Sequence, residues 1–520
     1  SASPHLPSTI CRIVNIPWKT WINAGVGAGV YLSLGVGCAS VPIRSPQGAH
    51  RPSYGLYMRG LMLERSTQLT DALDAYQQAL EHDQDSPFLH VRVGATQVKL
   101  GKTQQALKSF QRALSLEPSQ PDALRWMAML HTSQGQIDEA IRMYERLGQQ
   151  EPADRFVLST LADLYVLQGR LEEAIRMYER LIDVEGPSQQ LYFNLGVLSG
   201  RLGQFPQAIE HLSRALELVP DSVEVRVALG LTYELADQPA KAAAHYDEAI
   251  RLDPLNTRLY HHAARVYANQ DDVPQAVRSY QTLLDIDPQD LEAIVGLVRL
   301  WMAQGDYGQA QDLLGSKLRT MEERPELYLL LGLVYREADA PLEALRAFER
   351  ALALKDDGPQ AHFYLGAQLE RLHLEDEARA HLRRTIALDP NHADALNYLG
   401  YMDAEDGVNL REAKALIERA LALDPDNGAY LDSLGWVSYR LGQVQDAIRH
   451  LERAISLVDD DPTVFDHIGQ AYFTLGDLER AQQAWQKALE LDPGLQDVTL
   501  RLEQLYEMVF GLGVARRAWL

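Results

Sequence analysis

The sequence predicts an all-α protein: a right-handed α-solenoid of about 13 helix-turn-helix repeats that ends in a C-terminal capping helix. Alanine recurs every 34 residues, with one step of 35, from Ala72 to Ala481. Glycine or alanine precedes most of these alanines by twelve residues, and proline closes many of the units. Small side chains at a fixed spacing indicate paired helices that cross closely. Because one such pair cannot bury its own apolar stripe, it needs copies on both sides.

The unit Gly428–Asp461 has the clearest pattern. A break at Leu441-Gly442-Gln443 divides it into two halves, so the second helix folds back antiparallel on the first. In both halves apolar residues recur at helical spacing, namely Tyr430, Leu431, Leu434 and Val437, then Ala447, Ile448, Leu451, Ala454 and Ile455.

Charge and cysteine content limit the possible functions. The net charge is −23, and residues 1–52 contain four basic and no acidic residues, so they carry +4 and the remainder carries −27. An acidic solenoid repels phosphate backbones, which argues against nucleic-acid binding and suits soluble, particularly basic, protein partners. Only Cys11 and Cys38 occur, so neither a disulfide framework nor a structural zinc site is expected.

The first fifty residues differ from the repeats. Residues 21–37 form an apolar, glycine-rich run preceded by Arg12 and Lys19, which is the pattern of a secretory signal. Cys38 follows small residues, so residues 1–37 resemble a bacterial lipoprotein signal in which Cys38 is lipidated, and Ala39 after it implies the outer membrane. An ordinary signal peptide or a single anchor helix with an incidental cysteine is the alternative. Residues 38–52 are expected to form a proline-rich tether.

The repeat array is expected over residues 53–495. The thirteen units begin at 53, 87, 121, 155, 189, 223, 257, 291, 325, 359, 393, 428 and 462, and the eleventh has one extra residue in its inter-helix turn. Residues 496–520 are expected to cap the exposed end. The unit 291–324 is the weakest, because Val298 replaces the small residue of the first helix and Lys317 replaces a usual alanine. It is either a hinge between two arrays or a degenerate repeat that still packs.

Motifs for chemistry are weak throughout. Leu100-Gly101-Lys102-Thr103 resembles the end of a phosphate-binding loop but lacks its first glycine and falls in an inter-helix turn. Residues 424–428 lack the ligands of a calcium loop, and His261 and His262 point too far apart in a helix to share a metal. No serine-hydrolase elbow or zinc-protease helix occurs. We therefore expect no enzyme activity, no cofactor, no nucleotide and no metal.

The inner surface of the C-terminal units is the most distinctive feature. Aromatic residues flanked by carboxylates suit an extended peptide with apolar and basic side chains. Some of the rings are alternatively core between adjacent units. The candidate groove residues are Phe363, Asn397, Tyr401, Asp432, Trp436, Tyr439, Asp466 and Phe473.

The periodic pattern over residues 53–495 is identified as an array of tetratricopeptide repeats. A narrower stretch, residues 395–442 with its Asp432–Trp436 sequence DSLGW, is similar to a group of proteobacterial periplasmic tetratricopeptide lipoproteins. That resemblance implies a lipid-anchored scaffold at the outer membrane, facing the periplasm, that acts as adaptor between a carboxyl-terminal processing protease and its substrates. The alternative is an assembly lipoprotein of a pilus, secretion or polysaccharide-export complex.

Overall fold

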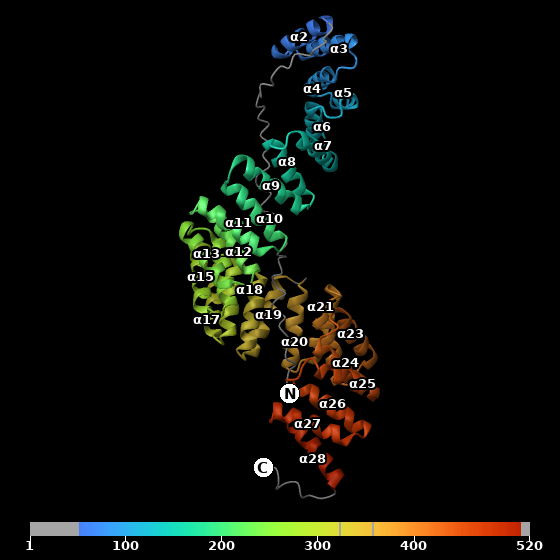
Figure 1. Ribbon diagram of the computed structural model, residues 1–520. Coiled ribbons are helices and arrows are strands. Elements are labelled where there is room, and N and C mark those ends of the chain that lie inside the picture. The colour runs from blue at the N-terminus through green and yellow to red at the C-terminus, as the bar shows by residue number, and fades with distance from the viewer. Residues whose placement is uncertain (1–50, 322–323, 356–357, 511–520) are drawn as a thin grey trace. The chain divides into compact units, whose positions relative to one another are not determined.

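The computed structural model describes residues 51–321, 324–355 and 358–510, and within these ranges every regular element is a helix (Figure 1). The predicted signal of residues 1–37, Cys38 and most of the tether lie outside the described residues. The chain divides into two compact units, with the boundary between Ile286 and Asp287. This boundary lies just before the weak repeat at 291–324.

The N-terminal unit consists of seven helix pairs within its described part. Its helices are α2 (Arg51–Arg65), α3 (Leu69–His82), α4 (Pro87–Lys99), α5 (Thr103–Leu116), α6 (Pro121–Ser133), α7 (Ile137–Gln150), α8 (Arg155–Leu167), α9 (Leu171–Glu185), α10 (Gln189–Arg201), α11 (Phe205–Leu218), α12 (Val223–Leu235), α13 (Pro239–Leu252), α14 (Thr257–Asn269) and α15 (Val273–Ile286).

The C-terminal unit consists of six further pairs and a final helix. Its helices are α16 (Leu291–Ala303), α17 (Tyr307–Thr320), α18 (Pro325–Glu337), α19 (Pro341–Leu354), α20 (Pro359–Arg371), α21 (Glu375–Leu388), α22 (Ala393–Glu405), α23 (Leu410–Leu423), α24 (Gly428–Arg440), α25 (Val444–Ile455), α26 (Pro462–Leu475), α27 (Leu478–Leu491) and α28 (Gln496–Phe510).

Each repeat pairs a first helix, here called the A helix, with a second, the B helix. From the second repeat onward, the A helix begins at the residue where the sequence places the start of the unit. Many of these starts have a side-chain cap, such as Ser86 Oγ and Asp290 Oδ1, which accept the backbone N–H groups of Leu89 and Ala293. The first A helix, α2, begins at Arg51 and so includes the last two residues of the predicted tether.

Each turn from an A helix to its B helix contains a residue with positive φ. Glycine occupies this position in many repeats, for example Gly101 at 73° and Gly442 at 76°, because it lacks the Cβ that makes this region costly. Gly101 is the glycine of the segment that resembles a phosphate-binding loop. Its role in the fold is therefore to close a turn.

The repeated small residues explain the helix packing. All thirteen alanines from Ala72 to Ala481 at the 34-residue spacing are completely buried. The glycines of the A helices face the second turn of the B helix, so a Cβ on Gly230 would lie 2.5 Å from the Tyr246 ring. On Gly435 it would lie 2.5 Å from Leu451 Cγ. The predicted α-solenoid is confirmed, and its small residues set the close crossing of each helix pair.

Successive A helices lie side by side in the C-terminal unit. Among its last repeats, α22, α24 and α26 contact one another more extensively than the successive B helices do. Residues on the shared side of α22, α24 and α26 therefore lie close to one another across successive repeats.

Two repeats differ from the rest. In the weak one, α16 and α17 contact each other less than the other pairs, since Val298 stands where glycine allows close crossing elsewhere. In the eleventh, the extra residue gives a turn with positive φ at both Gly407 and Asn409. The buried Asp403 fixes this turn, accepting Arg379 Nε at 2.9 Å and Asn409 Nδ2 at 3.4 Å.

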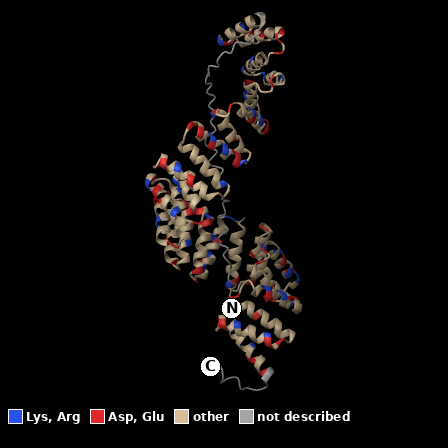
Figure 2. Ribbon diagram, viewed as in Figure 1, with Lys and Arg blue, Asp and Glu red and all other residues tan. Residues whose placement is uncertain are grey.

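Acidic and basic residues are interspersed along both units (Figure 2). No helix in the described part of the chain combines the length and apolar character needed to cross a membrane. Helix α28 packs on α27 through the buried Val498 and Leu505, while residues 511–520 of the predicted cap lie outside the described residues.

Candidate peptide-binding groove of the C-terminal unit

The eight predicted groove residues all lie on A helices. Phe363 belongs to α20, Asn397 and Tyr401 to α22, Asp432, Trp436 and Tyr439 to α24, and Asp466 and Phe473 to α26. The structure brings Tyr401, Asp432, Trp436 and Tyr439 together around one histidine that the sequence analysis did not single out, His467 of α26.

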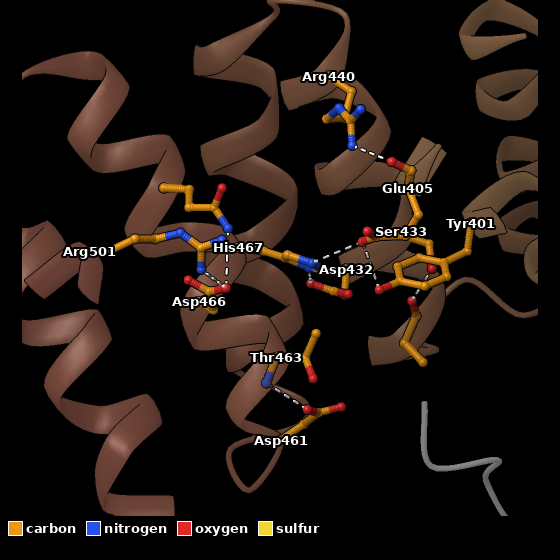
Figure 3. Close-up of polar contacts among 12 residues, drawn as sticks. Tyr401, Glu405, Asp432, Ser433, Arg440, Asp461, Thr463, Asp466, His467 and Arg501 are labelled. Carbon is orange, nitrogen blue, oxygen red and sulfur yellow. Dashed lines mark hydrogen bonds and ion pairs between the residues drawn. The ribbon is translucent and has the colours of Figure 1, made fainter. Parts of the chain in front are cut away.

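His467 forms a buried pair with Asp432 (Figure 3). Its Nδ1 donates to Asp432 Oδ1 at 2.9 Å, and the two residues are 3% and 7% exposed. Burial by itself lowers the pKa of His467, but Asp432, and more weakly Asp466 and Glu405, oppose that effect and raise the pKa above its ordinary value. The pair therefore favours a protonated imidazole against an ionised carboxylate inside the fold.

Trp436 is part of the same packed interior. Its ring stacks on His467, with centroids 4.2 Å apart and planes at 13°, and on Tyr439 at 5.2 Å. The sequence predicts Asp432 and Trp436 as residues of the peptide-binding groove. In the structure Trp436 is only 6% exposed and the carboxylate of Asp432 is used by His467, so both residues support the surface rather than form it.

Three further rings, on α22, α24 and α26, are partly exposed, and we call Tyr401, Tyr439 and Phe473 the aromatic row. Tyr401 and Tyr439 lie against His467 and Trp436, while Phe473 packs against Trp485 of α27, with ring centres 5.6 Å apart. Hydrogen bonds hold two of them: Tyr401 donates to Glu405 Oε1 at 3.0 Å, and the Tyr439 hydroxyl lies 3.1 Å from Thr474 Oγ1. Glu405 keeps 44% of its side chain exposed. The accessible chemistry is thus aromatic with a carboxylate beside it.

Arg440 completes the edge of this surface. Its Nη1 donates to the Glu405 carbonyl oxygen at 2.6 Å, and its guanidinium lies 5.6 Å from the centre of the Trp436 ring (Figure 3). This contact ties the end of α24 to the end of α22. Both Glu405 and Arg440 were missed by the sequence analysis.

Asp466 has a structural role in this unit. Its two oxygens accept Trp485 Nε1 at 3.0 Å, Arg501 Nη1 at 2.6 Å and Gln470 Nε2 at 3.2 Å. These bonds connect α26 to α27 and α28. With its lone pairs engaged in this way, Asp466 is a weaker candidate for ligand contact than the sequence indicated.

Phe363 and Asn397 lie outside the cluster around His467. Phe363 is 2% exposed and packs in the core, its ring 4.9 Å from that of His392. It therefore belongs to the core, which was the alternative considered for such rings. Asn397 is half-buried, and its Oδ1 has no hydrogen-bond partner among the described residues.

The sequence held one signal for His467. It follows Asp432 by 35 residues, one repeat length plus one, which places it on the next A helix facing the preceding one. The spacing alone does not decide whether the two side chains meet, because it does not give the rotation of one A helix relative to the next. Glu405 and Arg440 occupy the same position in successive repeats, and the Arg440 side chain reaches the Glu405 backbone.

The remaining motifs have ordinary roles. Residues 424–427 lie between α23 and α24, where Asn427 Oδ1 accepts the N–H of Tyr430 at 3.2 Å. His262 stacks on Tyr246 with ring centres 5.1 Å apart. Over the part of the chain that the structure describes, no three His, Cys, Asp or Glu side chains gather to hold a metal ion.

Comparison with known proteins identifies the repeats. Models described as tetratricopeptide repeat match residues 97–157, 133–195, 234–299 and 270–334, then 200–257 and 402–462, and finally 462–495. The helix pairs, positive-φ turns and buried alanines define the class as an α-solenoid of helix-turn-helix repeats. The chain belongs to the tetratricopeptide repeat family.

Solved structures give only a general likeness. The Cut9–Hcn1 hetero-tetramer of the APC/C matches at 17% identity and a TM-score of 0.40, covering 82% of this chain and 92% of that one. MamA matches at 23% identity and a TM-score of 0.30, covering 32% and 91%. A thermophilic TPR protein of Thermus thermophilus matches at 24% and 0.31, covering 35% and 98%. No curated protein sequence matches the chain.

Proposed function

We propose that the chain is a non-enzymatic scaffold that binds an extended segment of a protein partner along the aromatic row. The observation that carries the proposal is the arrangement of Tyr401, Tyr439 and Phe473, three partly exposed rings on successive A helices, two of which lie against the buried His467–Trp436 stack. Exposed aromatic anchors on a preorganised surface are typical of binding hot spots. Glu405 beside them favours a segment that combines apolar with basic side chains.

Binding through the aromatic row predicts a loss of affinity on truncating Tyr439. Tyr439→Ser should weaken capture of the partner by about thirtyfold, since losing an aromatic anchor typically costs about 2 kcal/mol. The partner is first isolated by crosslinking and copurification, and its affinity for each variant is then measured by titration. Tyr54→Ser is the matched control, because Tyr54 is half exposed but lies on α2 of the other unit. Equal losses for both variants, or none, would refute the row as the binding surface.

We further propose that the scaffold is an outer-membrane lipoprotein facing the periplasm and that it brings an envelope protease together with its substrates. Support comes from the likeness of residues 395–442 to periplasmic tetratricopeptide lipoproteins and from Cys38 after an apolar, glycine-rich run. Copurification distinguishes this from an assembly lipoprotein of a pilus, secretion or polysaccharide-export complex. The first predicts a protease with its substrates, and the second predicts a channel or fibre subunit.

The anchoring hypothesis predicts a defined change at Cys38. Cys38→Ser should leave a protein without an acyl chain, either uncleaved or released in soluble form, because only the cysteine thiol can accept the lipid. Mass spectrometry of the mature amino terminus measures this directly in a proteobacterial host. A wild-type terminus at another residue, or an unmodified Cys38, would rule the anchor out.

A further inference from the structure

A cavity of about 690 Å³ opens in the N-terminal unit, separate from the aromatic row. It lies among α8, α9 and α10 and the turn before α8. Its lining combines polar and apolar side chains, among them Phe156, Asp163, Tyr178, Glu185, Leu191 and Asn194.

Asp163 provides the key chemistry of this cavity. Its Oδ1 accepts the Tyr178 hydroxyl at 3.0 Å, while no arginine or lysine of the described chain pairs with it. Burial raises the pKa of Asp163, and the hydrogen bond from Tyr178 lowers it in part. The carboxylate nevertheless remains accessible to solvent. The Asp163 carboxylate lines a cavity and has no cationic partner among the described residues. A ligand that brings a cation to it should therefore gain binding free energy from a charge-assisted hydrogen bond.

The Tyr178 hydroxyl holds Asp163 in place. Tyr178 of α9 is buried, and it donates to the carboxylate of Asp163 on α8. On α10, Gln190 Nε2 donates to Asn194 Oδ1 at 2.9 Å, which orients the Asn194 side chain in the cavity lining. Because a buried hydroxyl from a second helix orients it, the Asp163 carboxylate is preorganised and binding need not order it.

The charged side chains that line the cavity carry a net negative charge, the same sign as that of Asp163. The lining contains three carboxylates, Asp154, Asp163 and Glu185, against one guanidinium, Arg155, so it carries −2. Arg155 already lies 3.5 Å from Glu185, and Asp154 pairs with Arg125 outside the lining at 2.9 Å. Phe156, which is 49% exposed, adds an apolar shelf at the mouth.

We propose that this cavity binds a lysine or arginine side chain from an extended segment of a partner protein. The cationic head pairs with Asp163, and the aliphatic stem lies against Phe156 and Leu191, the usual division of labour for these amphipathic side chains. An anionic ligand such as a phosphate is disfavoured by the net charge of the lining. The site lies in a different unit from the aromatic row and does not depend on it.

Selection from a random nonapeptide library displayed on phage tests the proposal with the full chain. Peptides enriched on the wild-type protein should share lysine or arginine at one position, and Asp163→Asn should abolish that enrichment. The asparagine oxygen can still accept the Tyr178 hydrogen, so the variant keeps the fold, and its melting temperature verifies this. Glu172→Gln, an exposed position on α9 outside the cavity lining, is the control that removes the same charge elsewhere.

Titration of one selected peptide gives the quantitative test. Replacing its basic residue with the uncharged isostere norleucine should weaken binding to the wild-type chain about tenfold or more. The same replacement should change binding to Asp163→Asn by far less. Enrichment without a basic position, equal enrichment by Asp163→Asn, or norleucine binding as tightly as lysine would each overturn the proposal. Because the aromatic row also favours basic side chains, the norleucine effect on the wild-type chain assigns the basic residue to this cavity only together with its loss in Asp163→Asn, whose fold the melting temperature verifies.

Discussion

At the scale of single residues, the pair Asp432–His467 is the central contact of the C-terminal unit. Both residues are more than nine-tenths buried, so removing either one leaves the other uncompensated in the interior. The imidazole also supports Trp436, which in turn supports Tyr439 of the aromatic row. Substitution here is therefore expected to act first on stability and only through it on binding.

The raised pKa of His467 predicts how stability changes with pH. A histidine whose pKa is higher in the folded than in the unfolded state stabilises the fold fully below the unfolded pKa of about 6.5. This stabilisation is lost as pH rises through the folded pKa. Melting of the C-terminal unit should therefore shift to lower temperature between neutral and alkaline pH, and Asp432→Asn should reduce that shift. Calorimetry across this range measures it, and an unchanged shift in Asp432→Asn would contradict the assignment.

His262 of the N-terminal unit is the internal contrast. Burial, with Arg265 and other nearby positive groups, lowers the pKa of His262 to about 4. A lowered histidine pKa reverses the pH dependence of stability, because the unfolded chain then binds the proton better than the folded chain. Acidification from pH 7 to 5 should cost the N-terminal unit about 2 kcal/mol through this group. His262 and His467 should thus contribute to stability with opposite pH dependence.

At the scale of elements, α28 is held by contacts that reach back two helices. Arg501 of α28 bonds to Asp466 of α26, which also accepts Trp485 of α27. Arg501→Met should loosen α28 by about 1 kcal/mol, because a partly exposed charged hydrogen bond contributes only modestly. Hydrogen exchange should therefore speed up over residues 496–510 alone. Arg453→Met, which breaks the more exposed pair with Asp426, should leave that segment unchanged.

Prediction from sequence succeeded for the packing of the two helices within one repeat. The spacing of Ala447 and Gly435 required a close helix crossing, and the crossing is there. Prediction was weaker for the groove, because a position on an A helix does not say whether a side chain is covered by the next repeat. Trp436 is covered by His467 and Tyr439, while Tyr439 itself stays partly exposed. That difference depends on the rotation between neighbouring repeats, which periodicity does not contain.

At the scale of the whole molecule, contacts between neighbouring helix pairs, rather than one central core, stabilise the chain. In such an array a local defect spreads to adjacent repeats and weakens with distance. The boundary between Ile286 and Asp287 should limit the spread of a defect, because the two helices of the weak repeat that follows it pack less closely than those of the other repeats. A defect introduced on one side of this boundary should therefore remain on that side.

Paired substitutions of glycine test this locality. A Cβ on Gly435 would lie 2.5 Å from Leu451 Cγ and 3.2 Å from the Ala447 carbonyl oxygen, and one on Gly230 would lie 2.5 Å from the Tyr246 ring. Gly435→Leu should destabilise its surroundings by at least about 1–3 kcal/mol through overpacking. Exchange should accelerate in repeats around residues 428–461 and stay unchanged over residues 51–286, with Gly230→Leu giving the reverse. If either substitution accelerated exchange throughout both units, the chain would unfold as one cooperative body, and its two groups of repeats would not be independent in stability.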